Sequence, residues 1–402
     1  MKDDGSMFHL ISVFHAESSD GYAKTELEKL TDSFSIFLLF LLVTSFSLAI
    51  TLASCYADME HVVSPENVRE AMKIMRANGV RTTPLVEGSA SLIPFKQIKL
   101  FFKLEPFQRT GSFKIRGATN AIHALVQDKN AQDIKDLVVV TVSSGNFAQG
   151  VALAARNLGL NALIIMPNNT SKIKVAAVQS YGAKVIFCEP NERNEHTARI
   201  IKELGPIAQF IHPSENPNVI AGNGTLFLEM FEQCKQVFSQ KLHVVVVPIG
   251  GGGVISGVAA VARELGVLVV GGEPLLADDA FRSIKTGSIQ HHRENKVPTT
   301  IAEGLRTTLG PNTFPCVRDW VSEIILVSEE EIQAAMKLVM ERLKVVAEAS
   351  SCVAYAAVRN PKFAEFIQSN FSGKDNINVG IVLTGGNVDL DYLPFQSRLA
   401  VL

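Results

Sequence analysis

Short apolar runs alternate with segments of helical periodicity along most of this chain. The apolar runs lie at 99–104, 137–142, 162–166 and 184–188, and the segments of helical spacing that follow them lie at 112–126, 148–158, 173–181 and 194–204. Continuous runs of Val, Ile and Leu are typical of parallel strands that are covered on both faces. The pattern therefore predicts an α/β fold with a doubly wound parallel sheet.

Two lobes are predicted from the order of these segments. A helix over 65–77, with Ser64 as its N-cap, opens the globular part of the chain. The stretch 136–213 is a self-contained series of strand and helix units. We expect it to form a small α/β domain inserted into a larger domain made of 59–135 and 214–402, with the active site in the cleft between them.

The N-terminal extension, residues 1–58, differs from the rest of the chain. The segment 33–57 contains no charged residue, and its core is long enough to cross a bilayer as a helix. Three interpretations stay open: a membrane anchor, a signal peptide, and a physiological start at Met59 that leaves this segment untranslated. The protein is cytoplasmic if translation starts at Met59 and membrane-anchored or secretory otherwise. We expect membrane contact only through 33–57, a hydrophobic segment outside the fold.

Composition and charge exclude several classes of protein. The chain has 402 residues, 47% of them hydrophobic, and a formal net charge of -2. Because no basic stripe with interleaved aromatic residues is present, we expect no nucleic-acid partner, and a small anionic metabolite fits better. The five cysteines form no CxxC pair, so neither a zinc site nor a disulfide framework is predicted.

Lys114 lies in a sequence context that favours a reactive amine. It follows Thr110-Gly111-Ser112, a turn with an N-cap, so we expect it in the first turn of a helix. The helix dipole disfavours the ammonium form there and favours a neutral, nucleophilic amine. Phe113 beside it can stack on a planar heterocycle.

Two later segments supply what a pyridoxal phosphate lysine would need. After the strand 244–247, the loop Gly250 to Gly253 leads into a helix, so that its backbone N–H groups can converge on a phosphate. After the strand 378–383, Thr384 places a hydroxyl at the carboxyl end of a strand, where open α/β sheets bind ligands. The glycines match neither a Walker loop nor the dinucleotide fingerprint. An NAD site stays open as an alternative, because Glu273 follows at the distance of a ribose-binding acid.

Two further segments carry polar groups that can bind ligands. Ser143-Ser144-Gly145-Asn146-Phe147 follows the strand 137–142 and begins a helix, so it can bind a substrate carboxylate, although an ordinary N-cap explains the same residues. The turn 273–279 offers carboxylates and a free carbonyl, which suits magnesium or calcium. A solvated acidic turn is the alternative.

Together these motifs resemble the fold-type II pyridoxal phosphate enzymes, in particular the serine racemases and the serine/threonine dehydratases. The resemblance covers about 64–390 and rests on 107–118, the Ser-Ser-Gly-Asn segment, the tetraglycine loop and Thr384-Gly385-Gly386-Asn387. It implies a two-lobed, tryptophan synthase beta-like fold with pyridoxal 5'-phosphate as cofactor. The cofactor residues it implies are Lys114 as the Schiff-base lysine, Phe113 against the ring, Asn146 at the phenolic oxygen, Gly250, Gly251, Gly252 and Gly253 at the phosphate, Gly304 over the other face of the ring and Thr384 at the pyridine nitrogen.

The resemblance also implies residues for the substrate, a cation and an effector. These are Ser143 and Phe147 at the substrate carboxylate, Ser144 facing Lys114 across the substrate, Glu273, the carbonyl of Ala277 and Asp279 at Mg²⁺ or Ca²⁺, and Gln149, Tyr181 and Asn387 at an ATP effector. The family usually has His at the position of Phe147. An imidazole hydrogen bond is therefore lost here, and only the backbone donor remains at this position for the substrate carboxylate. Substrate choice or rate is expected to differ from those of the typical family member.

The activity implied by the resemblance is the interconversion of L- and D-serine, with β-elimination of serine to pyruvate and ammonia as a companion activity. Lys114 would exchange a proton on one face of the substrate and Ser144 on the other. A small hydroxy amino acid is the expected substrate and a homodimer the expected assembly. An L-threonine/L-serine ammonia-lyase is the nearest alternative, and a relative that binds the cofactor without turnover stays open.

Overall fold

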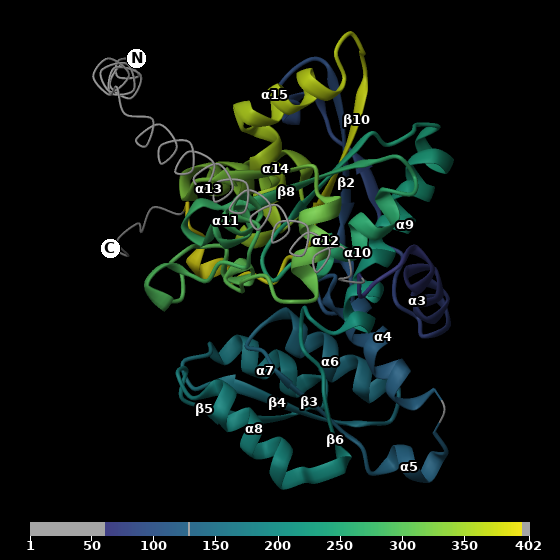
Figure 1. The fold of residues 1–402 in the computed structure, drawn as a ribbon, viewed down its shortest axis with the longest axis vertical. Helices are drawn as coiled ribbons and strands as arrows, with labels where there is room; N and C mark the ends of the chain where they lie inside the picture. The colour runs from purple at the N-terminus through teal and green to yellow at the C-terminus, as the bar shows by residue number, and fades with distance from the viewer. Residues whose placement is uncertain (1–60, 128, 396–402) are drawn as a thin grey trace, which may run out of the picture. The chain divides into compact units, whose positions relative to one another are not determined.

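The computed structural model describes residues 61–127 and 129–395, which form two β-sheets covered by helices (Figure 1). The predicted α/β fold with parallel sheets is confirmed. The hydrophobic segment 33–57 and Cys55 lie outside the described residues. Within the described residues, no helix is long and apolar enough to cross a membrane. The cysteines described there are free and buried, namely Cys188, Cys234, Cys316 and Cys352.

The larger sheet has six strands, and all but one of its strand pairs are parallel. In spatial order the strands are β1 (Leu85–Glu87), β2 (Ile98–Leu104), β10 (Ile377–Leu383), β7 (Val244–Pro248), β8 (Leu268–Pro274) and β9 (Glu323–Val327). The exception is β1, which runs antiparallel to β2 at one edge. The sheet thus joins the first strands of the described chain to its last one.

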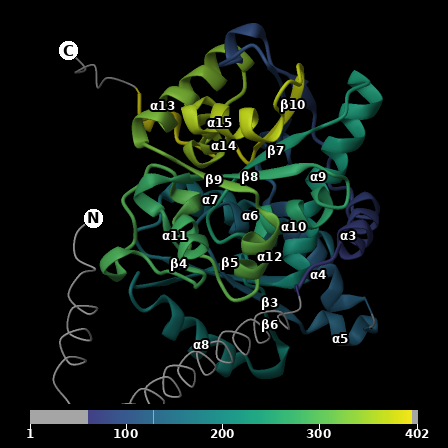
Figure 2. The same cartoon turned by 45° about the horizontal axis from the view of Figure 1, so that its top comes forward.

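Successive residues of the central strands face two different hydrophobic cores. Phe101 and Val245 lie in one core, whereas Phe102 and Val246 lie in the other, as the two-residue repeat of a strand requires. The helices of the first core are α3 (Pro65–Ala77), α9 (Pro217–Phe238), α10 (Gly253–Ala262) and α12 (Thr313–Trp320), and those of the second are α13 (Glu329–Leu338), α14 (Ala349–Arg359) and α15 (Pro361–Asn370). Figure 2 shows α14 and α10 on opposite sides of β7 and β8. Coverage of both faces explains why the strands read as continuous apolar runs.

The smaller sheet has four parallel strands. In spatial order they are β5 (Lys184–Cys188), β4 (Asn161–Pro167), β3 (Val138–Val142) and β6 (Ala208–Phe210). The neighbouring helices are α4 (Lys114–Val126), α5 (Ala131–Lys135), α6 (Asn146–Asn157), α7 (Lys172–Ser180) and α8 (Arg193–Leu204). The apolar side of α4, including Ile115 and Ile122, lies in the same core as Val139 of β3 and Ile164 of β4. The helix that begins at Lys114 is therefore anchored on the smaller sheet.

Candidate functional site

The carboxyl ends of neighbouring strands lie at one edge of the larger sheet. Leu383 ends β10 beside Leu104 of β2, and Pro248 ends β7 beside Gly272 of β8. Because these strands are parallel, Thr384 and the glycine loop after β7 leave the sheet at the same edge. This is where open α/β sheets bind ligands.

Lys114 begins α4 as predicted, but Ser112 is not the N-cap of this helix. The N-cap position is Phe113, whose side chain makes no capping bond. Ser112 instead forms an antiparallel bridge with Gly385, and the Phe113 N–H donates to the carbonyl of Thr384 at 3.0 Å. The predicted cap is wrong because pairing with the segment after β10 takes Ser112 away from the helix. The same pairing fixes Lys114 next to Thr384.

The amine of Lys114 is partly buried between aromatic rings and a backbone carbonyl. Its Nζ lies 3.5 Å from the carbonyl oxygen of Pro213, which follows β6, and 4.9 Å and 5.8 Å from the ring centroids of Phe113 and Phe147. Burial lowers the pKa of Lys114 to about 8, although the nearby Glu348 carboxylate opposes this shift. A fraction of the amine is therefore neutral at neutral pH, as a nucleophile or proton acceptor requires.

The helix α6 starts where β3 of the smaller sheet ends. Ser143 and Ser144 are partly buried in the connecting turn, and the Ser143 Oγ accepts a hydrogen bond from the Gly145 N–H at 3.3 Å. Phe147, which stands where the family usually has His, is 2% exposed and packs into the core of the smaller sheet with α4. Its ring fills the core, so at this position only the backbone N–H is left for a ligand.

Asn146, the first residue of α6, lies at the centre of a hydrogen-bonded chain. Its Nδ2 donates to Glu348 Oε1 at 2.7 Å, and its Oδ1 accepts from Asn387 Nδ2 at 2.8 Å. Asn387 Nδ2 also donates to the carbonyl oxygen of Thr110 at 2.7 Å. The structure thus joins the turn before Lys114, the start of α6 and the segment after β10. Glu348 was missed by the sequence analysis, because an acidic residue before a helix carries no distinctive signal.

The glycine loop 250–253 is packed too closely for side chains. A Cβ on Gly251 would stand 2.7 Å from Ser214 Oγ, and Gly252 has a φ of +78°, which favours glycine. Ser214 follows Pro213, whose carbonyl oxygen faces Lys114 Nζ. The lysine and the predicted phosphate loop are therefore neighbours through the two-residue segment 213–214, which the sequence motifs did not reveal.

Gly304 lies against the same loop. A Cβ on Gly250 would stand 3.3 Å from the Gly304 carbonyl oxygen and 2.9 Å from the Cα of Leu305. The Gly304 N–H donates to Ser350 Oγ at 2.9 Å, which ties this segment to α14. The structure therefore brings Gly304 to the predicted cofactor residues.

The residues of this edge fit a cofactor that carries a phosphate. Thr110 Oγ1 and Ser112 Oγ are buried and have no hydrogen-bond partner within the described part of the chain. Buried polar groups are normally paired, so such hydroxyls mark a place where a bound group completes the bonding. The loop before α10 separately presents backbone N–H groups without side chains, which suits the phosphate of such a cofactor.

Glu273 and Asp279 are both buried at the start of α11 (Asp279–Thr286). The carboxylate of Glu273 accepts backbone hydrogen bonds from Ala280 at 2.7 Å and Phe281 at 2.8 Å. Burial and then the Asp279 carboxylate hold the pKa of Glu273 well above its ordinary value, and burial raises the pKa of Asp279 to about 7. Both oxygens of the Glu273 carboxylate thus bind backbone N–H groups of α11, which is a structural role and not the ribose-binding role of the NAD interpretation.

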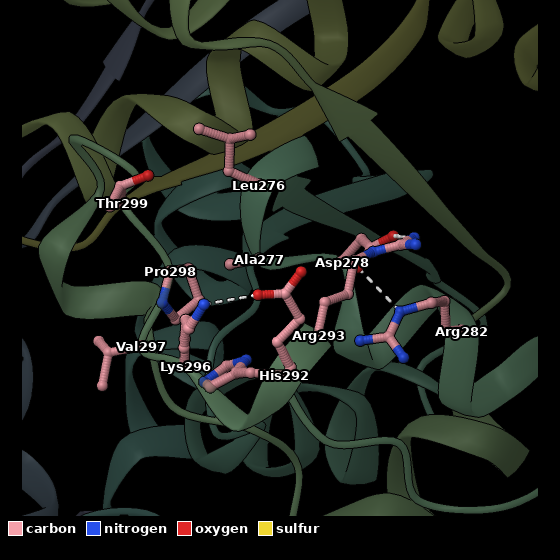
Figure 3. A pocket seen from close by; sticks show the side chains of 11 residues that line it. Leu276, Ala277, Asp278, Arg282, His292, Arg293, Lys296, Val297, Pro298 and Thr299 are labelled. Carbon is pink, nitrogen blue, oxygen red and sulfur yellow. Dashed lines mark hydrogen bonds and ion pairs between the residues drawn. The ribbon is translucent and has the colours of Figure 1, made fainter.

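The predicted cation ligands combine two carboxylates with the carbonyl of Ala277. Over residues 61–127 and 129–395, no group of three or more His, Cys, Asp or Glu side chains is placed to hold a metal ion. The carboxylate of Asp278, which is not one of the predicted ligands, pairs with Arg282 at 2.8 Å and Arg293 at 2.6 Å. A pocket of ≈ 250 Å³ lies beside it (Figure 3) and is lined by Leu276, Ala277, Asp278, Arg282, His292, Arg293, Glu294, Lys296, Val297, Pro298 and Thr299.

The predicted effector residues are only partly brought together. Tyr181 OH donates to the carbonyl oxygen of Arg109 at 3.0 Å, and Asn387 contacts that of Thr110, so both contact the same turn. Gln149 is buried on α6. Asn387 also holds Asn146, which places it inside the predicted cofactor site.

Comparison with known proteins gives a single family. The family described as pyridoxal-phosphate dependent enzyme matches residues 76–385. A serine racemase from Dictyostelium discoideum is 38% identical over 335 residues, which are 82% of this chain and 97% of the relative. The solved structure of maize serine racemase has a TM-score of 0.73 at 38% identity and covers 82% of this chain and 95% of its own. A solved threonine deaminase from T.th. has a TM-score of 0.71 at 35% identity, with 81% of this chain and 99% of its own covered.

Proposed function

This chain belongs to the family of pyridoxal-phosphate-dependent enzymes, and we propose that it interconverts L- and D-serine and also converts serine to pyruvate and ammonia. The observation that carries this proposal is the 38% identity to a serine racemase across 97% of that relative's length. The position of Lys114 supports it, because a partly neutral amine lies where strands of both sheets end.

The proposed cofactor residues are those that the structure groups around Lys114. Pyridoxal 5'-phosphate, when bound, supplies an aldehyde for amino groups and an electron-withdrawing ring that acidifies the Cα proton of an amino acid. Lys114 would hold the aldehyde carbon, and the loop 250–253 would hold the phosphate. The remaining proposed contacts are Phe113 and Gly304 on the two faces of the ring, Asn146 at the phenolic oxygen and Thr384 at the pyridine nitrogen.

Lys114 and Ser144 are the proposed acid–base residues. Burial lowers the pKa of Lys114 to about 8, so its Nζ can accept the Cα proton of the substrate near neutral pH. Ser144 Oγ is proposed to return a proton on the other face, which inverts the configuration. Ser143 and the backbone N–H of Phe147 would bind the substrate carboxylate at the start of α6. Loss of the β-hydroxyl after proton removal leads instead to pyruvate and ammonia.

Further features of the proposal concern regulation and assembly. Glu273, the Ala277 carbonyl and Asp279 would bind Mg²⁺ or Ca²⁺, which suits two buried carboxylates, one of which raises the pKa of the other. Asp279 also lies 3.7 Å from His292 Nδ1. Gln149, Tyr181 and Asn387 would bind ATP as an effector. We also propose a homodimer, and a division into a small domain over 136–213 and a large domain over 59–135 and 214–402, in which α4 of the large-domain range packs into the core of the smaller sheet.

An L-threonine/L-serine ammonia-lyase is the second candidate. It is favoured by the similarity to threonine deaminase, at 35% identity over 99% of that structure. Both activities begin with removal of the same proton, so they share Lys114 and the cofactor residues. Only the second acid–base residue distinguishes them.

The substitution Ser144→Ala separates the two candidates. In the racemase it should nearly abolish interconversion of L- and D-serine and pyruvate formation from D-serine, while pyruvate formation from L-serine continues through Lys114. The N-cap of α6 is Gly145, with no side-chain capping bond, so the N-cap interpretation of the serines is wrong. If Ser144 had only a structural role in this turn, the substitution would affect both enantiomers equally. Rates with each enantiomer at saturating cofactor are the measurement. A uniform fall in all rates would favour the ammonia-lyase.

A further inference from the structure

Glu348 is a carboxylate whose backbone and side chain are both held at the site. It occupies the N-cap position of α14 without capping this helix, and its N–H donates to the Gly385 carbonyl oxygen at 3.0 Å. Its side chain reaches across to Asn146 Nδ2 at 2.7 Å. A Cβ on Gly385 would stand 2.6 Å from Glu348 Oε1, so glycine at this position leaves room for the carboxylate.

The hydrogen bonds around Asn146 allow only one orientation of its amide. Asn387 Nδ2 uses both of its N–H groups, one toward Thr110 and one toward Asn146, so the Asn146 atom that faces it must be the acceptor Oδ1. Nδ2 then faces Glu348, and an ionised carboxylate can only accept. This contact uses one of the two N–H bonds of Asn146 Nδ2, and the second remains for an acceptor in the site.

We propose that Glu348 is a positioning residue that fixes the Asn146 amide so that its second N–H meets the phenolic oxygen of the cofactor. This inference rests on the proposed function, which assigns Asn146 to that oxygen. Glu348 does not need to touch the substrate or the cofactor. Asn387, by donating to Oδ1, and Glu348, by accepting from Nδ2, together determine which end of the Asn146 amide faces the ring.

The ionisation of Glu348 gives this arrangement a pH dependence. Burial raises the pKa of Glu348 to about 7, against the hydrogen bond from Asn146. The charged groups that face it are Lys114 on α4, Lys174 on α7 and Glu303, which pairs with Lys174 at 2.6 Å. Lys174 and Lys114 favour the carboxylate, whereas Glu303 opposes it. Below pH 7 the hydrogen bond from Asn146 Nδ2 goes to a neutral carboxyl and is weaker than the bond to a carboxylate, so Glu348 holds the Asn146 amide less firmly.

The test compares the full chain with Glu348→Gln and Glu348→Ala, each loaded with pyridoxal phosphate. In the parent, the visible absorption of the bound cofactor without substrate should change with pH, with a midpoint near the Glu348 pKa of about 7. Both variants should lose this midpoint. Glutamine keeps an acceptor oxygen, so cofactor affinity should stay close to the parent in Glu348→Gln and fall roughly tenfold in Glu348→Ala, as loss of one hydrogen bond predicts. Glu303→Gln, which removes a neighbouring charge but no contact to Asn146, is the matched control. It should keep a midpoint, shifted to lower pH, because Glu303 raises the pKa of Glu348.

Two outcomes overturn the inference. The first is that Glu348→Ala has the same pH midpoint and the same cofactor affinity as the parent. This result would refute the role of Glu348 but not the proposed function. The other is additive loss of stability for Asn146→Ala and Glu348→Ala in urea unfolding of the cofactor-free chain, because residues that are coupled through a hydrogen bond must be non-additive. Absence of the absorption band from the parent itself would instead refute the proposed function, and the inference with it.

Discussion

Replacing Arg116 with methionine tests what holds the first turn of α4 in place. Arg116 lies two residues after Lys114, and its side chain is fully buried. Its guanidinium donates to Glu105 at 2.8 Å and 2.9 Å and to Glu229 at 2.9 Å and 2.7 Å. Lys103 Nζ also binds Glu229, at 2.8 Å. These four side chains tie α4 to β2, to the turn after β2 and to α9.

The size of the expected effect follows from the charges in this cluster. Lys103 and Arg116 balance Glu105 and Glu229, so Arg116→Met leaves one buried negative charge without a partner. Removing one member of a buried ion pair costs about 3–5 kcal/mol, whereas a complete apolar replacement can be neutral. We therefore expect a loss of about 3–5 kcal/mol, and recovery of part of it when Glu105→Gln removes the uncompensated charge as well.

Urea unfolding of the cofactor-free chain is the assay, with the free energy of unfolding taken from the midpoint and the slope. Arg76→Met is the matched control, because the Arg76 side chain is 68% exposed and lies 3.7 Å from Glu232. Its cost should be at most about 1 kcal/mol. If Arg116→Met cost no more than this control, or if Glu105→Gln recovered nothing, the charge argument would be wrong.

Three further predictions concern the cation and the lysine. Ca²⁺ or Mg²⁺ at about 100 times its dissociation constant should raise the free energy of unfolding of the parent by about 2.7 kcal/mol, and that of Asp279→Asn by much less. If the urea midpoint of the parent were the same with the ion and with a chelator, the cation site would be wrong. Only the neutral amine of Lys114 attacks pyridoxal phosphate. The rate at which the cofactor-free chain reacts with it should therefore rise about tenfold for each pH unit up to the Lys114 pKa of about 8 and stay constant at higher pH. Between pH 8 and 10.5 the unfolded chain binds more protons at Lys114 than the folded chain does. The free energy of unfolding of the parent, relative to that of Lys114→Met, should therefore rise with pH across this range. If this difference in free energy did not change with pH, the lowered pKa would be wrong.

The pattern of the chain was sufficient to predict much of its local structure. The helix expected over 65–77 is α3, and Lys114 begins a helix as its turn residues indicate. The tetraglycine segment was recognised because a strand, a loop without side chains and a helix start follow one another directly in the sequence. These features depend on neighbours within a few positions, where backbone preferences and apolar spacing act.

Contacts between distant segments were decided by the tertiary structure alone. Asn146 and Glu348 are 202 positions apart and meet only because the start of α6, which packs on the smaller sheet, and the start of α14, which packs on the larger sheet, lie side by side. Ser112 was expected to cap α4 but pairs with Gly385, since β10 ends beside β2. The lowered pKa of Lys114 arises from burial, which depends on how segments far apart along the chain pack around the amine. Local spacing carries no signal for such pairs, because the order of strands in the sheet determines which segments become neighbours.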